Sequence, residues 1–152
     1  MLRNLKNLTK TLFIAAVLYG PLGVAAEPGV VTVYKTALCG CCQGWVEHMR
    51  SRGFDVTTRD LQSSELSSVK SHYRIPASVH SCHTAVVDGY VVEGHVPAEI
   101  VTRLLTERPA VIGISAPGMP AASPGMDIPS GGPYDIVIFD AGGGTQLYQR
   151  VE

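Results

Sequence analysis

The spacing of apolar residues predicts two strand–helix pairs in the first half of the chain. The β-branched run VVTVYK at 30–35 indicates a buried strand. A helix is expected next, because apolar residues then recur at intervals of three and four: Cys42, Trp45, Val46 and Met49. The alternating segment FDVTTRDL at 54–61 predicts a second strand. A second helix, capped by Ser63 and ended by Pro76, has the apolar positions Leu66, Val69 and Tyr73.

The second half predicts two hairpins and one further helix. The apolar runs HTAVV and YVVEG flank Asp88-Gly89, a dipeptide that favours a two-residue hairpin turn. The helix is expected to begin at Pro97 and to end before Pro109. Its apolar face is formed by Ile100, Val101, Leu104 and Leu105. Residues 113–133, rich in Gly, Pro, Ser and Met, predict a loop. The segments YDIVIFD and TQLYQRV are expected to close as a last hairpin.

The order of these elements, β-α-β-α-β-β-α, predicts an α/β protein with the thioredoxin-like layout. A strand, a crossover helix and a second strand imply parallel pairing, and the hairpin then adds antiparallel strands. The loop and hairpin of 113–152 form a C-terminal extension. A C-x-x-C motif, from Cys39 to Cys42, stands between the first strand and the first helix, where that layout carries its redox motif.

The first 26 residues are expected to be a secretory signal peptide rather than part of the fold. The stretch has a basic start, the short apolar run LFIAAVL, and the small residues Val24 and Ala26 before an expected cleavage at Glu27. The apolar run is shorter than the roughly 18–20 residues that span a bilayer, so we do not expect a membrane anchor. The mature chain, 27–152, is then a single exported domain.

Charge and cysteine content narrow the classes of function. Without the leader the chain has nine basic and thirteen acidic residues, a net charge of −4 with neutral histidines. This acidic balance argues against nucleic acid as a partner. No other stretch of the sequence is apolar enough to span a membrane, so no membrane partner is expected. All four cysteines lie in the exported part, where thiols must be paired, kept reduced or bound to metal.

Three of the cysteines are crowded at the start of the first helix. Thiolates at Cys39, Cys41 and Cys42 are stabilised there by unpaired N–H groups and by the helix dipole. A disulfide between Cys39 and Cys42 would leave Cys41 exposed, because adjacent helix positions project about 100° apart. A thiol oxidoreductase has no evident use for this third thiol, whereas three converging thiolates suit Cu(I) or Zn(II).

The other candidate ligands lie far along the chain. In the predicted layout Cys82 and His83 pass beside the N-terminus of the first helix, and His95 approaches the same end of the sheet. The Gly/Pro-rich loop adds the thioethers of Met119 and Met126, for which hydrophobic anchoring is the alternative role. Thiolate, imidazole and thioether together favour copper over zinc, although four nitrogen and sulfur ligands also satisfy zinc. Surface positions are expected for the remaining histidines, His48, His72 and His80.

Several motifs together resemble the periplasmic copper-resistance family CopG. They are YKTALCGCC, SCHTAVV, EGHVPAEI, PGMP with SPGM, and YDIVIFD, and they run through nearly the whole exported chain. The resemblance implies a periplasmic thioredoxin-like protein of copper resistance that holds several Cu(I) ions in a cysteine-bridged cluster. It also implies interconversion of Cu(I) and Cu(II), with other periplasmic copper-handling proteins as candidate partners. The metal site is then expected at Cys39, Cys41, Cys42, Cys82, His83, His95 and Met119.

Two alternatives stay open on the sequence alone. One is a periplasmic thiol–disulfide oxidoreductase with Cys39 as nucleophile and Cys42 as resolving thiol, which needs neither Cys41 nor Cys82. The other is a secreted binding module held by two structural disulfides. Whether the protein is an enzyme, a copper oxidoreductase, is a separate question that the sequence leaves open. The copper hypothesis requires Cys82 to lie within about 10 Å of the other three cysteines.

Overall fold

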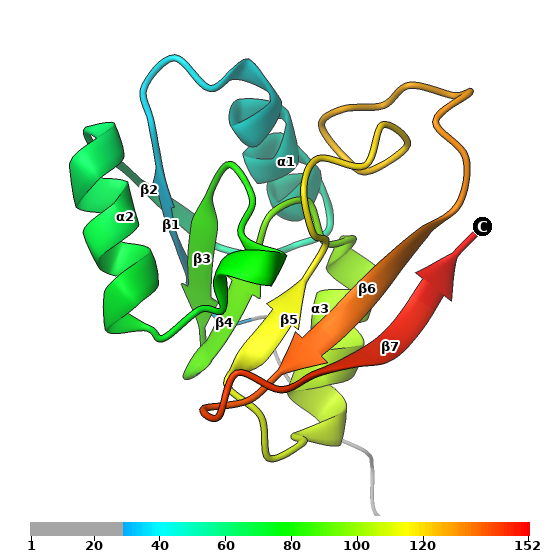
Figure 1. The fold of residues 1–152 in the computed structure, drawn as a ribbon. Coiled ribbons are helices and arrows are strands. Elements are labelled where there is room, and N and C mark those ends of the chain that lie inside the picture. The colour runs from blue at the N-terminus through cyan, green and yellow to red at the C-terminus, as the bar shows by residue number, and fades with distance from the viewer. Residues whose placement is uncertain (1–28) are drawn as a thin grey trace, which may run out of the picture.

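The computed structural model describes residues 29–152, so the predicted signal peptide at 1–26 lies outside the described residues. Within 29–152 the chain forms three α-helices and seven strands that pair into one mixed sheet (Figure 1). The strands are β1 (Val31–Lys35), β2 (Val56–Asp60), β3 (Thr84–Val87), β4 (Tyr90–Glu93), β5 (Gly113–Ser115), β6 (Tyr134–Phe139) and β7 (Thr145–Val151). The helices are α1 (Gly40–Ser51), α2 (Ser63–His72) and α3 (Ala98–Glu107), and a 3₁₀ turn at Ala77–Val79 precedes β3.

The sheet combines parallel and antiparallel pairs in the order β2-β1-β3-β4-β5-β6-β7. β1 pairs parallel with β2, as a strand–helix–strand unit requires, and antiparallel with β3. β3 and β4 form the predicted hairpin. Its turn residues Asp88 and Gly89 have φ values of 49° and 85°, the left-handed conformation that such a tight turn needs. From β1 to α3 the major strands and helices follow one another in the predicted order.

The segment that we predicted as a loop begins with a strand. Gly113–Ser115 (β5) pairs parallel with β4 and antiparallel with β6, so the C-terminal hairpin β6–β7 continues the main sheet. The prediction of an uninterrupted loop over 113–133 was therefore wrong at its start, because three residues carry too little periodicity to indicate a strand. A Cβ on Gly113 would lie 2.0 Å from the Val91 carbonyl oxygen, so glycine permits the close approach of β5 to β4.

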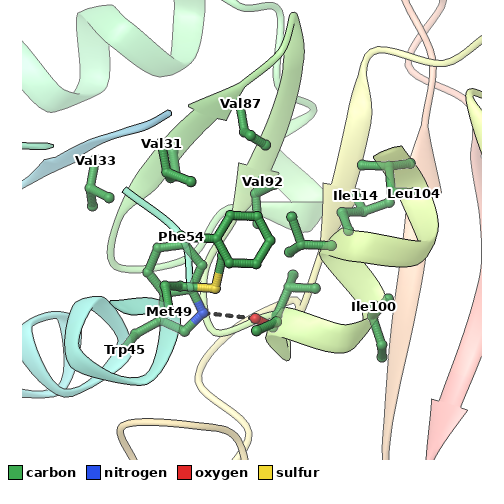
Figure 2. Close-up of a cluster of buried hydrophobic side chains, with 14 of the residues drawn as sticks. Val31, Val33, Trp45, Met49, Phe54, Val87, Val92, Ile100, Leu104 and Ile114 are labelled. Carbon is green, nitrogen blue, oxygen red and sulfur yellow. Dashed lines mark hydrogen bonds between the residues drawn. The ribbon is translucent and has the colours of Figure 1, made fainter. Parts of the chain in front are cut away.

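The main core lies between the sheet and the pair α1 and α3, on one face (Figure 1). The predicted apolar positions of α1, from Cys42 to Met49, are fully buried, and Figure 2 shows Trp45 and Met49 among strand valines and α3 leucine and isoleucine. Trp45 Nε1 donates a hydrogen bond to the Val96 carbonyl oxygen at 2.8 Å. Because each large apolar side chain contributes about 1.5–3 kcal/mol when buried, this layer holds α1 firmly against the sheet.

The opposite face of the sheet, beneath α2 and the 3₁₀ turn, is partly polar. Its apolar cluster contains Ile75, Val79, Val91 and Phe139. Buried polar side chains come from α2 and the sheet: Lys70, Thr84, Glu93 and Ser115. The N-cap of α2 is Gln62 rather than the predicted Ser63, and its backbone N–H donates to Glu65 Oε2 at 2.7 Å. Among the helices of residues 29–152, none has both the length and the hydrophobicity that crossing a bilayer requires.

Candidate metal centre

The four cysteines meet at the N-terminus of α1. Their four sulfur atoms all lie within 4.8 Å of one another, well inside the limit on which the copper hypothesis depends. Cys39 is the N-cap of α1, Cys41 lies in the first turn, and Cys42 begins the buried stripe of the helix. Cys82 is brought to them by the segment that leads into β3. The sequence-predicted convergence of the sulfurs is therefore present in the structure.

One pair of these cysteines is oxidised. Cys39 and Cys42 form a disulfide, while Cys41 and Cys82 are free thiols. Cys41 Sγ lies 3.6 Å from Cys39 Sγ, and its side chain is partly buried rather than exposed as we expected for the oxidised C-x-x-C motif. Residues 29–152 include all four cysteines and contain a single disulfide, so the alternative with two structural disulfides does not agree with the structure.

Two histidines extend the sulfur cluster toward the interior. Cys82 Sγ lies 2.9 Å from His95 Nε2 and 3.6 Å from His83 Nδ1. With Cys42, these three residues form a second group whose ligand atoms lie within 4.8 Å of one another. His95 Nδ1 donates to the Pro124 carbonyl oxygen at 2.7 Å, which leaves the Nε2 lone pair directed at Cys82. Such a hydrogen bond on the far ring nitrogen is typical of metal-binding histidines.

His83 has a nitrogen without a partner. Its ring is fully buried, with ring centroids 4.5 Å from Trp45 and 5.1 Å from His95. Among residues 29–152, Nε2 of this ring is a buried side-chain atom with no hydrogen-bond partner. Because buried polar atoms are otherwise almost always satisfied, the orphaned nitrogen fits a site that binds a metal ion. Thiols and imidazoles side by side are also the donors that soft and borderline metals prefer.

Burial favours the neutral forms of three candidate ligands, Cys82, His83 and His95. Burial, with a smaller contribution from the nearby Cys41, raises the pKa of Cys82 to about 12. Burial, followed by the neighbouring His95 and Lys70, lowers the pKa of His83 well below its usual value, and burial also lowers the pKa of His95. Neutral imidazoles are ready to bind metal, whereas Cys82 requires a cation beside it to lose its proton at neutral pH.

Met119 lies at the rim of the site. It lines an open hollow of about 300 Å³ together with His80, Ser81, Cys82 and Gly118. Its side chain is 55% exposed, so the structure brings it beside Cys82 without burying it among the sulfurs. Met126 is half-buried farther along the same loop. His80 and His72 are exposed, as predicted.

The Gly/Pro-rich loop, residues 116–133, packs against the N-terminal half of α1. A Cβ on Gly125 would lie 2.5 Å from both the Cys41 carbonyl oxygen and the Trp45 nitrogen, and a Cβ on Gly44 would lie 2.9 Å from the Gly125 Cα. The two glycines thus allow the backbones of the loop and of α1 to come into contact. This contact places the Pro124 carbonyl within hydrogen-bond distance of His95. Figure 1 shows this loop, coloured yellow to orange, beside α1.

Sequence reasoning missed three residues around the site. His48 is more than a surface residue, because its Nε2 accepts a hydrogen bond from Ala98 N at 3.1 Å, at the first turn of α3. Lys70 and Glu93 form a buried ion pair on the α2 face of the sheet. The available signal was weak: Lys70 adjoins the predicted apolar stripe of α2, and Glu93 is the acidic end of an apolar strand.

Comparison with known proteins found a matching family model and similar solved structures. The family model described as "Protein of unknown function, DUF411" matches residues 79–126. A solved structure named copper resistance protein CopG, form 1, is 39% identical, with a TM-score of 0.75 over 82% of this chain and 98% of that chain. Form 2 is 38% identical, also with a TM-score of 0.75, over 83% of this chain and 100% of that chain. No protein of curated function matches the sequence.

Proposed function

Because the chain belongs to the family of the copper resistance protein CopG, we propose that it binds copper at its cysteine cluster and acts in copper resistance. The observation that carries the proposal is the meeting of four sulfurs, from two distant parts of the chain, within 4.8 Å of one another. Thiolate sulfur is a soft ligand and Cu(I) is a soft ion, so this donor set favours copper over harder metals.

The proposed site holds several Cu(I) ions bridged by cysteine. Two ligand groups, one of four sulfurs and one of two sulfurs and two imidazoles, share Cys42 and Cys82. A thiolate shared in this way can bridge two ions, which supports a multinuclear site. The proposed ligands are Cys39, Cys41, Cys42, Cys82, His83 and His95, with Met119 at the rim. Zinc is the less favoured metal, because a thioether is a poor zinc ligand.

The proposal also covers redox chemistry and the location of the protein in the cell. Oxidation of two thiolates to the Cys39–Cys42 disulfide releases two electrons, which matches the reduction of two Cu(II) ions to Cu(I). The presence of that disulfide beside the free Cys41 and Cys82 supports a role in interconverting the two copper states. The order and pairing of β1 to α3 support a thioredoxin-like domain. The sequence of residues 1–26 supports export to the periplasm.

Counting copper on the reduced protein tests the proposal. The mature chain, 27–152, is reduced, loaded anaerobically with excess Cu(I), desalted and analysed for copper and protein. We expect more than one tightly held ion per chain, and the same number in His72→Ala, which changes an exposed histidine outside the cluster. Absence of tightly held copper would end the proposal. Displacement of Cu(I) by an equal amount of Zn(II) would contradict the choice of metal.

A thiol–disulfide oxidoreductase is the second candidate, because the Cys39–Cys42 disulfide lies at the N-terminus of α1. That position lowers the pKa of an attacking thiol in general. Catalytic reduction of insulin that is unchanged in Cys82→Ser would favour this candidate. The copper proposal instead expects little insulin reduction and a large loss of copper in Cys82→Ser.

A further inference from the structure

A buried carboxylate is hydrogen-bonded to the segment that carries Cys82. Glu93, the last residue of β4, is fully buried and accepts three hydrogen bonds. Its Oε1 accepts from the Ser81 backbone N–H at 2.6 Å and from Lys70 Nζ, and its Oε2 accepts from Thr84 Oγ1 at 2.7 Å. Lys70 Nζ also donates to Thr84 Oγ1 at 3.0 Å, so the ammonium and the carboxylate are joined twice.

The hydrogen bond to Ser81 connects this network to the metal centre. Ser81 immediately precedes Cys82, and its side-chain hydroxyl donates to the carbonyl oxygen of Gly118, the residue before Met119. One carboxylate therefore contacts a residue that precedes one proposed ligand, Cys82, and is hydrogen-bonded to the residue before another, Met119. The strand pairing of β3 begins only at Thr84, so it does not by itself fix the backbone at Ser81 and Cys82.

Ser81 is held from its other side by Gly94. A Cβ on Gly94 would lie 2.4 Å from Ser81 Oγ and 2.5 Å from Ser81 Cβ. The Gly94 N–H also donates to the His83 carbonyl oxygen at 3.0 Å. The short segment 81–83 is therefore clamped between Glu93 and Gly94, with little freedom to shift.

Stability alone is a weak reason for this network. A buried ion pair often contributes little compared with apolar residues of the same volume, because both charges lose their hydration. The three donors converge on a carboxylate whose oxygens lie outside both groups of candidate ligands, and one of those donors is the backbone N–H of Ser81, the residue before Cys82. What a carboxylate supplies here is a strong acceptor at a fixed point, since hydrogen bonds to charged acceptors are stronger than neutral ones.

We propose that Glu93 is a positioning residue of the metal centre, which with Lys70 as its counter-ion fixes Ser81 and thereby the location of the Cys82 sulfur and of Met119. This inference rests on the proposed copper function. The buried polar residues on the α2 face of the sheet would then position the proposed ligands without binding metal themselves.

The test compares two double variants that both remove the buried charges. Lys70→Met with Glu93→Gln keeps an amide oxygen that can accept from Ser81 N–H, whereas Lys70→Met with Glu93→Leu keeps no acceptor. Single variants would leave one charge buried without a partner, which is strongly destabilising. Circular dichroism and thermal unfolding test whether both double variants fold. If either double variant does not fold, Ser81→Pro, which removes the donor N–H, is used instead.

Two measurements follow on each variant. The first is the rate at which Cys82 reacts with a maleimide in a Cys41→Ser background with the Cys39–Cys42 disulfide intact, where Cys82 is the single free thiol. The second is Cu(I) affinity of the reduced protein, without Cys41→Ser, in competition with a chelator. Loss of one hydrogen bond to a charged acceptor, which corresponds to about tenfold in an equilibrium constant, sets the expected scale.

We expect the Leu double, or Ser81→Pro, to react about tenfold faster at Cys82 and to bind Cu(I) about tenfold more weakly. The Gln double, whose neutral amide oxygen still accepts from Ser81 N–H, should change less in both measurements. Parent-like labelling and affinity in the Leu double, or equal losses in both doubles, would overturn the assignment; for Ser81→Pro the overturning result is parent-like behaviour. If the parent binds no Cu(I), the proposed function fails, and the labelling rates still decide whether Glu93 positions Cys82.

Discussion

At the scale of single residues, Cys41 is the residue that distinguishes a candidate metal-binding site from an ordinary dithiol redox site. The Cys39–Cys42 disulfide accounts for two sulfurs, yet Cys41 Sγ lies 3.6 Å from Cys39 Sγ and belongs to the same group of candidate ligands as Cys82. A dithiol enzyme requires no third sulfur so close to its disulfide. The close approach of the third sulfur has an evident function only if the sulfurs bind metal together.

Replacing Cys41 by serine should lower the copper content without unfolding the protein. A hydroxyl is a hard, weak ligand for Cu(I), so we expect the reduced Cys41→Ser variant to hold at least one ion fewer than the parent. The side chain is only partly buried, and the thermal unfolding temperature should change little. An unchanged copper-to-protein ratio would show that the third thiol is not a ligand.

His48 should make stability depend on pH. Burial, followed by the nearby Arg52, lowers the pKa of His48 below its ordinary value of 6.5, although Glu99 and Asp127 oppose the shift. The unfolded chain therefore takes up a proton near pH 6.5 that the folded chain accepts only at lower pH. The stabilisation from neutral His48 is present above pH 6.5 and is lost as the pH falls below it. Protonation also removes the acceptor for Ala98 N–H and puts a positive charge at a helix N-terminus.

Urea unfolding of the metal-free protein between pH 7.5 and 5 measures this effect. We expect the free energy of unfolding to fall with acid less steeply in His48→Gln, which cannot titrate, than in the parent. Other histidines contribute equally to both proteins, so the difference between the two slopes isolates His48. Identical slopes would contradict the assignment.

The candidate ligand residues could be predicted from the sequence, but the residues that support them could not. Cysteines and histidines in close succession, such as Cys82 with His83, carry a chemical signal of their own. Lys70 and Glu93 are common residue types whose burial depends on two elements meeting face to face, and His48 depends on where α3 begins. No local pattern encodes such meetings.

At the scale of elements, the loop of residues 116–133 is packed closely against α1. The backbones of Gly44 and Gly125 are in contact, and the loop also supplies the Pro124 carbonyl that orients His95. The orientation of one candidate ligand thus depends on packing between a helix and a segment that lacks regular structure.

Gly125→Ala should weaken copper binding by lifting the loop from α1. Gly125 has φ +87°, and an added Cβ would lie 2.5 Å from two backbone atoms of α1, which must then move apart. Gly132→Ala is the matched control, because Gly132 has φ +72° but no atom within 4 Å of the added Cβ. Both variants should lose the roughly 1–2 kcal/mol of a left-handed alanine.

We expect only Gly125→Ala to bind Cu(I) more weakly in competition with a chelator, and to lose more stability than the control in urea unfolding. Equal copper affinity in both variants would show that the loop contact does not support the site.

Prediction of the elements succeeded where periodicity extended over several residues. The faces of α1 and α3 and the Asp88-Gly89 hairpin follow directly from the sequence pattern. β5 was missed because Gly113–Ser115 is a strand only by virtue of its two neighbours, β4 and β6. The continuity of the C-terminal hairpin with the main sheet depends on that short strand.

At the scale of the whole molecule, the centre forms where four separate segments of the chain meet. They are the start of α1, the segment before β3, the segment after β4, and the loop after β5. The layout of β1 to α3 predicted the first three, because neighbouring strands bring their ends to one edge of a sheet. The loop's approach to α1 depends on glycine contacts that no periodic pattern reveals.

The oxidation state of the molecule should control its copper capacity. In the disulfide form, two of the four sulfurs are bonded to each other and cannot act as thiolates. We expect the oxidised protein to hold fewer Cu(I) ions than the reduced protein, and treatment with a thiol reductant under anaerobic conditions to restore the full number. Equal stoichiometry in the two states would show that Cys39 and Cys42 are not ligands.

The packing of Trp45 against His83 has a practical consequence. The chain contains a single tryptophan, and its indole ring lies 4.5 Å, between ring centroids, from the buried imidazole whose Nε2 lacks a partner. Its fluorescence therefore reports from one known point beside the proposed ligands. An ion arriving at that imidazole should quench the emission, so the protein carries its own optical sensor of occupancy and needs no attached dye.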